Sequence, residues 1–172
     1  MTDRDGDLKP TSSMDDERAA LRHLLAIIAY RGGKVLRDAP VGFGATSVGH
    51  GIRSSVEIRV YVGDLSEWGL AIAAEGRHRW SDTRSDDWDE QVDRFFAGLA
   101  SVDAHLASGG GIARSATRLA QGPFADALNH IGQLAMLRRV AGAPVKGENY
   151  FKAEITIGRV GPDQAPPVYE FG

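Results

Sequence analysis

The length, composition and charge of the chain limit what kind of protein it can be. With 172 residues, of which 42% are hydrophobic and 25% charged, the chain is typical of one globular domain with a substantial core. Its formal net charge of -3 gives no reason to expect nucleic acid as a partner. The chain contains no cysteine, which excludes disulfides, thiolate metal ligands and a cysteine nucleophile.

The two ends of the chain differ in character from the middle. Residues 1–12 are polar and predict a disordered arm, without the apolar stretch of a signal peptide. No later segment approaches the ~20 uninterrupted apolar residues that a membrane helix needs. We therefore expect a cytoplasmic protein that has no membrane partner.

Two stretches in the first half of the chain predict amphipathic helices. The first begins after Ser12 or Ser13, ahead of acidic residues that suit a helix N-terminus. The pair Gly32-Gly33 marks either a kink in this helix or its early end. The second helix begins with a capping box at residues 54–57 and ends at Gly76.

Two further helices are predicted in the second half. Apolar residues from Val92 to Leu106 have the clearest helical period in the chain, and the glycines at 109–111 end that helix. A short helical turn over 113–121 precedes the last helix, which has Pro123 at its first position and continues to Val140. The remaining residues read as an extended tail, with a short hairpin around Gly158.

These elements predict an all-α fold, a four-helix bundle over residues 13–142 with an extended tail over 143–172 that packs on it. The connectors between the first and second helices and between the third and fourth are long. Because long connectors allow neighbouring helices to run parallel, a plain up-down-up-down order does not follow.

The last predicted helix contains the most informative motif, Asp126-Ala-Leu-Asn-His130-Ile-Gly-Gln133. Its three polar side chains recur at i, i+4 and i+7 and so share one helix face. A carboxylate and an imidazole one turn apart can hold a metal ion. The alternatives are that His130 is satisfied by a carbonyl or by Asp126, and that Asp126 only stabilises the helix start.

The second helix adds Tyr61 and Asp64, which share a face because they are three residues apart. Tyr61 is either a core aromatic residue with its hydroxyl at the rim, or a ligand or catalytic group. Asp64 is expected to orient or cap a neighbouring group. A His-x-x-x-His pair is absent, although His23 or His105 from another helix is an alternative ligand.

Val62-Gly63-Asp64-Leu65 together with Asp126 to Leu134 resembles the DinB-like (YfiT-like) superfamily of four-helix metalloenzymes. The resemblance covers roughly residues 16–142 and implies an up-down-down-up bundle. It also implies a three-histidine metal site, with one histidine on the second helix and two on the fourth in the pattern His-x-x-x-His-x-Gly-Gln. His130 matches the second histidine of that pattern, Asp126 stands in place of the first, and Tyr61 occupies the position on the second helix.

The resemblance implies a divalent transition metal (zinc, nickel or iron) held by Asp126, His130 and Tyr61, with Tyr61 and Asp64 as catalytic residues. Family members with intact sites include thiol-dependent transferases and isomerases, so a small-molecule substrate or a low-molecular-weight thiol is the expected partner. Two replaced histidines weaken such a site, because tyrosine must first lose a proton of pKa about 10. The alternative is a non-catalytic binding or structural bundle, a homodimer, in which Asp126 and His130 form a hydrogen-bonded pair.

Overall fold

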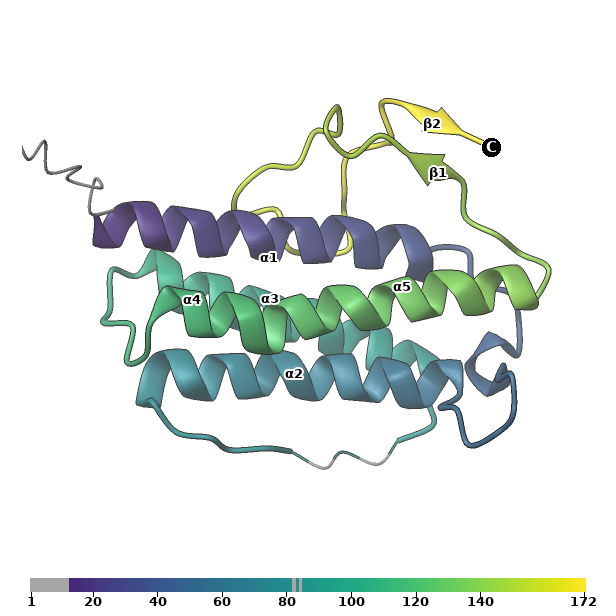
Figure 1. Ribbon diagram of the computed structural model, residues 1–172, viewed down its shortest axis with the longest axis horizontal. Coiled ribbons are helices and arrows are strands. Elements are labelled where there is room, and N and C mark those ends of the chain that lie inside the picture. Colours follow the sequence, from purple (N-terminus) through teal and green to yellow (C-terminus); the bar gives the residue numbers. More distant parts are fainter. Residues whose placement is uncertain (1–12, 82, 84) are drawn as a thin grey trace, which may run out of the picture.

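The described part of the chain folds into four long helices, in agreement with the predicted all-α class. The computed structural model describes residues 13–81, 83 and 85–172, so the predicted N-terminal arm lies outside the described residues. The long helices are α1 (Met14–Leu36), α2 (Ser55–Glu75), α3 (Trp88–Ala107) and α5 (Ala125–Val140) (Figure 1). Shorter elements are the 3-10 helix η1 (Phe43–Ala45), α4 (Ala116–Leu119) and the strands β1 (Gly147–Glu148) and β2 (Glu170–Phe171).

The starts of the first two helices follow directly from local sequence. Ser13 caps α1 and Ser54 caps α2, each accepting a hydrogen bond from the backbone N–H three residues later. Asp16 and Glu57 complete the two capping boxes by accepting from the backbone N–H of the capping serine. Gly76 ends α2 with φ of 68°, a left-handed conformation that glycine adopts without strain. Both predicted starts, and the predicted end of α2, are confirmed.

The pair Gly32-Gly33 neither kinks nor ends α1, which continues to Leu36. Both glycines are buried where α3 crosses this helix. A Cβ added to Gly32 would lie 2.5 Å from the ring of Phe95, and one added to Gly33 would lie 3.7 Å from the ring of Phe96. Gly32 therefore allows the Phe95 ring to approach the backbone of α1, which is a tertiary requirement and not a helix signal, whereas a Cβ on Gly33 would be in ordinary van der Waals contact.

Side-chain contacts show that α2 and α3 run parallel. Arg59 of α2 donates to the carbonyl of Gln91 on α3, and further along both helices Glu67 pairs with Arg94. Two consecutive helices can be parallel only if the chain between them returns along the bundle. The connector from Gly76 to α3 makes this crossing over the outer side of α2 (Figure 1).

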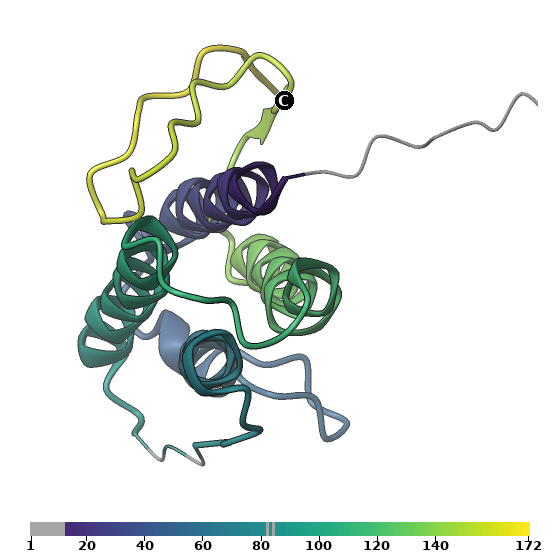
Figure 2. The same cartoon turned by 90° about the vertical axis from the view of Figure 1, so that its left-hand side faces the viewer.

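The other two helices run in the opposite direction. Arg22 near the start of α1 pairs with Asp103 near the end of α3, and Gly32 near the end of α1 meets Phe95 in the first half of α3. These contacts make α1 and α3 antiparallel. Figures 1 and 2 show α5 beside α1 and directed the same way, so α1 and α5 oppose α2 and α3.

The last helix begins where the sequence predicts. The segment η2 (Ala120–Phe124) joins α4 to α5, and inside it Pro123 is the first residue after a kink between two helices. Gly122 has non-helical angles of φ -87° and ψ -105° at this point. Because proline has no N–H to donate and disfavours helical angles at the residue before it, the helical run that begins at Ala116 breaks at Gly122 and a new one starts at Pro123.

The C-terminal tail packs on the outer side of α1 (Figure 2). Buried Glu148 accepts hydrogen bonds from Tyr30 at 2.7 Å and from Lys34 at 2.7 Å. Gly158 lies at a turn with φ of 87°. The tail reverses near it, because Gly147 of β1 pairs antiparallel with Phe171 of β2, but a long loop joins these strands and the predicted short hairpin is not formed. Lys34 also pairs with Glu170 at 2.8 Å, so one lysine holds the two ends of the tail together.

In the described part of the chain, none of the helices combines the length and the apolar character required to cross a membrane.

Candidate functional site

The structure brings together Tyr61, Asp126 and His130, which we call the Tyr61 triad. Tyr61 lies on α2, and the other two residues lie one turn apart at the start of α5. The Tyr61 hydroxyl donates to one carboxylate oxygen of Asp126 at 3.1 Å. The Tyr61 ring also packs on the His130 imidazole, with centroids 4.7 Å apart and planes tilted by 42°.

The Nδ1 atom of His130 faces Asp126 only. It lies 2.9 Å from the main-chain oxygen of Asp126 and 3.2 Å from the second carboxylate oxygen. Because both neighbours of Nδ1 are acceptors, this nitrogen carries the proton and donates. The His130 side chain is 11% exposed and that of Asp126 is 36% exposed, so the triad lies at the edge of the core.

The surroundings keep Tyr61 protonated at neutral pH. Burial raises the pKa of the Tyr61 phenol, and the negative charge of Asp126 and the hydrogen bond to it raise that pKa further. A tyrosine binds a metal ion as phenolate, so each of these effects opposes ligation.

The triad does not fit a metal ion held by all three residues. Asp126 already accepts from Tyr61 on one oxygen and faces His130 Nδ1 with the other. Across the described residues, no group of three or more His, Cys, Asp or Glu side chains is arranged to hold a metal ion. Neither alternative histidine completes the site, since His23 is exposed on α1 and His105 has no hydrogen bond or ring contact to His130 in the described chain.

A cleft of about 850 Å³ lies on the outer side of α2, and we call it the α2 cleft. The ring of Tyr61 forms part of its wall, with Trp80 at 5.2 Å between centroids and the guanidinium of Arg53 4.5 Å above the ring. Asp126 and His130 do not line the cleft; they contact Tyr61 on the side that faces away from it. The lining residues come from α2 and from the segments on either side of it: Arg53, Val56, Glu57, Val60, Tyr61, Asp64, Trp68, Trp80, Thr83, Ser85 and Asp86.

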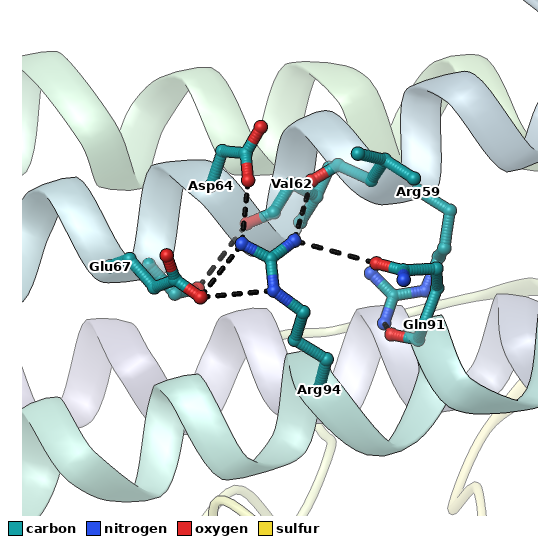
Figure 3. A network of polar contacts seen from close by, with 8 residues as sticks. Arg59, Val62, Asp64, Glu67, Gln91 and Arg94 are labelled. Atoms are coloured by element: carbon teal, nitrogen blue, oxygen red, sulfur yellow. Dashed lines mark hydrogen bonds and ion pairs between the residues drawn. The ribbon is translucent and has the colours of Figure 1, made fainter. Parts of the chain in front are cut away.

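Asp64 forms an ion pair with Arg94 of α3 and no hydrogen bond with Tyr61. Its carboxylate accepts from Arg94 at 2.5 Å, and Glu67 accepts from the same guanidinium at 2.7 Å (Figure 3). Arg94 also donates to the main-chain oxygen of Val60 at 3.3 Å. Asp64 therefore binds an arginine of α3, and its expected orienting or catalytic role stays a prediction.

The position of Arg94 explains why a glycine, Gly63, stands in the middle of α2. A Cβ at this position would lie 2.6 Å from Nη1 of Arg94, so the missing side chain makes room for the guanidinium to cross the helix. The motif Val62-Gly63-Asp64 thus serves the contact between α2 and α3. Arg94 itself has no local signal in the sequence, but an isolated glycine inside an amphipathic helix indicates such a close approach.

Arg59 is a second buried cation that the sequence did not reveal. It is 1% exposed, donates to the main-chain oxygen of Gln91 at 2.7 Å and lies 4.3 Å above the ring of Phe95. Its Nε has no hydrogen-bond partner in the part of the chain that the structure describes. Burial lowers the pKa of Arg59 to about 9, and the positive charge of Arg94 lowers it further in the same direction.

Gln133, the third polar residue of the α5 motif, is half-buried, and its side chain forms no hydrogen bond with any described residue. The motif therefore divides into a bonded pair, Asp126 and His130, and a glutamine that takes no part in the triad.

Comparisons with family models, with curated proteins and with solved structures find no match to this chain. The DinB-like resemblance consequently rests on the motifs of α2 and α5, and it stays a prediction.

Proposed function

We propose that this chain is a DinB-like four-helix protein that binds a small molecule in the α2 cleft, and that the hydrogen-bonded Tyr61 triad replaces the metal site. This is the non-catalytic alternative that the sequence left open.

The observation that carries the proposal is the closed set of hydrogen bonds among Tyr61, Asp126 and His130. Both carboxylate oxygens of Asp126 face a donor, one from the Tyr61 hydroxyl and one from His130 Nδ1. A metal ion would have to displace both donors and remove a proton from a phenol whose pKa is raised. A triad of this kind stabilises the contact between α2 and α5 without a metal ion.

The helix directions support the DinB-like part of the proposal. The resemblance implies an up-down-down-up order. Side-chain contacts make α2 parallel to α3 and α1 antiparallel to α3. Figure 1 shows that α5 runs in the same direction as α1, so the four helices have this order. The motif residues Tyr61, Asp126 and His130 also meet at one point between α2 and α5.

The α2 cleft supports the binding part of the proposal. Its volume lies in the range of small-molecule sites, roughly 300–1,000 Å³. Its wall combines aromatic rings with a few charged groups, which is the usual composition of such sites. A flat ligand can stack on Tyr61 or Trp80 and place polar groups near Arg53 or Asp64.

The second candidate is the metal-dependent thiol transferase or isomerase implied by the resemblance. The spacing of Asp126 and His130 favours it, since the two side chains meet one turn apart on α5. In that case Asp126 and His130 hold the ion, and Tyr61 and Asp64 act on the substrate. A cytoplasmic location and a homodimer stay predictions from the sequence.

Thermal unfolding with and without metal distinguishes the two functions. Protein without a histidine tag is treated with EDTA and then titrated with zinc, nickel or ferrous iron, for the wild type and for His130→Ala. We expect a wild-type Tm that does not depend on metal, and a Tm of His130→Ala that is lower by the same amount with or without metal. Removing a buried, hydrogen-bonded imidazole should cost about 1–3 kcal/mol.

The matched control is His23→Ala, which removes an exposed histidine from α1 and should leave the Tm unchanged. One equivalent of bound metal, together with a metal-dependent rise in the Tm that His130→Ala abolishes, would establish the metal-dependent candidate instead.

A further inference from the structure

A second hollow of about 600 Å³ adjoins the α2 cleft and is separated from it by Trp68, which lines both. We call it the Arg118 pocket. It lies between the end of α2 and the helical run of α4 and η2. The lining residues are Trp68, Ile72, His78, Arg114, Ser115, Arg118, Gln121, Gly122 and Pro123.

The inner wall of the Arg118 pocket is apolar and fits a flat ring. Trp68, Ile72 and Pro123 form this wall, and the position of a Cβ on Gly122 lies 3.9 Å from the Trp68 ring. The indole N–H of Trp68 already donates to His78 at 3.2 Å, which holds the ring in place. Gln121 and Gly122, beside the kink that precedes Pro123, complete the lining on this side.

The charged side chains of this pocket are the two arginines, Arg114 and Arg118. The described lining includes no aspartate or glutamate, and His78 accepts from Trp68. The Arg118 guanidinium has no hydrogen-bond or ion-pair partner in the described chain. Arg114 uses one N–H to donate to the carbonyl of Gly76 at 3.1 Å, so its other donors remain available.

The neighbouring α2 cleft has the opposite character. Glu57, Asp64 and Asp86 line it together with one arginine, Arg53. The two cavities share Trp68 but present different charges, so an anion is attracted to the Arg118 pocket and not to the α2 cleft.

We propose that the Arg118 pocket binds an aromatic carboxylate, with the ring against Trp68 and the carboxylate held by the guanidinium groups of Arg118 and Arg114. A planar guanidinium can donate two parallel hydrogen bonds to a carboxylate, and the apolar wall removes the aromatic ring from water. This site is separate from the α2 cleft and from the Tyr61 triad, so it goes beyond the proposed function.

Isothermal titration calorimetry with 2-naphthoate tests the proposal, with the neutral analogue 2-naphthalenemethanol as the comparison. We expect the carboxylate to bind more tightly than the alcohol and to lose affinity as salt is added. Because Arg118 is exposed, Arg118→Gln should weaken binding of 2-naphthoate by about five-fold, and Arg114→Gln/Arg118→Gln by more than ten-fold.

The Arg118 side chain has no hydrogen-bond or ion-pair partner among the described residues, so Arg118→Gln should leave the fold intact, which circular dichroism verifies. Arg139→Gln is the matched control, because Arg139 is an exposed arginine near the end of α5 and does not line the pocket. Its affinity for 2-naphthoate should equal that of the wild type.

Equal affinity for the alcohol and the carboxylate would overturn the proposal, as would an unchanged affinity in Arg118→Gln. A loss confined to Arg53→Gln would place the ligand in the α2 cleft and would also overturn it. Absence of binding in the millimolar range has the same consequence. None of these outcomes bears on the metal titration, so the two proposals fail independently.

Discussion

Replacing Gly63 by alanine tests whether this glycine exists to admit Arg94. In an ordinary helix interior the change stabilises by up to about 1 kcal/mol, because glycine is the poorer helix former. At position 63 the new Cβ would lie 2.6 Å from Nη1 and 3.1 Å from Cζ of Arg94. The guanidinium must therefore move, although it is held by Asp64 at 2.5 Å and by the carbonyl of Val60 at 3.3 Å.

The cost follows from what the moved guanidinium leaves behind. The Asp64 side chain is 5% exposed, and complete loss of the partner of a buried charge costs roughly 3–5 kcal/mol. Arg94 is long and keeps part of its contact with Glu67, so we expect about half of that loss, offset by the gain in helix propensity. Gly63→Ala should thus lower the free energy of unfolding by about 1–2 kcal/mol, which is a fall in Tm of roughly 2–8 °C.

Urea and thermal denaturation followed by circular dichroism measure this change. Gly132→Ala is the matched control, since Gly132 lies inside α5 and an added Cβ would meet nothing within 4 Å. That variant should be more stable than the wild type by about 0.5–1 kcal/mol.

A double-mutant cycle tests whether the close contact between the new Cβ and the Arg94 guanidinium causes the loss of stability. In an Arg94→Ala background the obstacle is gone, so Gly63→Ala should become stabilising, like Gly132→Ala. The reasoning would be refuted if Gly63→Ala stabilised the wild type, or if it destabilised both backgrounds equally.

Two further predictions concern buried groups. Arg59→Met should stabilise the protein by about 1–2 kcal/mol at pH 7 in urea denaturation, because Arg59 has no carboxylate partner among the described residues; a less stable variant would contradict this. Burial, assisted by the hydrogen bond to Glu148, raises the pKa of Tyr30 above its usual value of 10.0. Because the phenol pKa is higher in the folded than in the unfolded state, its contribution to stability is complete below about pH 10 and is lost as the pH rises further. Denaturation between about pH 9 and 11 should therefore show a steeper fall in the free energy of unfolding for the wild type than for Tyr30→Phe. Parallel pH profiles for these two proteins would refute the argument.

Local patterns in the sequence predicted most of the helices. The capping boxes at Ser13 and Ser54 depend on residues only three apart, so the sequence contains all of the information that they need. The same holds for the end of α2 at Gly76, where φ is positive. It also holds for Pro123, which follows the kink at Gly122 and begins the last helical run.

Pairings over long separations were not visible in the sequence. Arg94 and Asp64 are 30 residues apart, and no local period relates them. The same is true of Lys34 with Glu148 and Glu170, whose pairing closes the tail where a hairpin around Gly158 was expected. Such contacts depend on which helix faces are neighbours and in which direction each helix runs.

The sequence by itself therefore determined the helices, and it indicated the face of the last one that carries Asp126 and His130. Their hydrogen bonds to each other lie within one helical turn, which is a local relation. Only the tertiary structure decided that Tyr61 donates to Asp126 from α2, that Gly63 admits Arg94, and that basic residues gather beside Trp68. The reason is physical: helix formation depends on neighbours along the chain, whereas the chemistry of a site depends on which helices pack together.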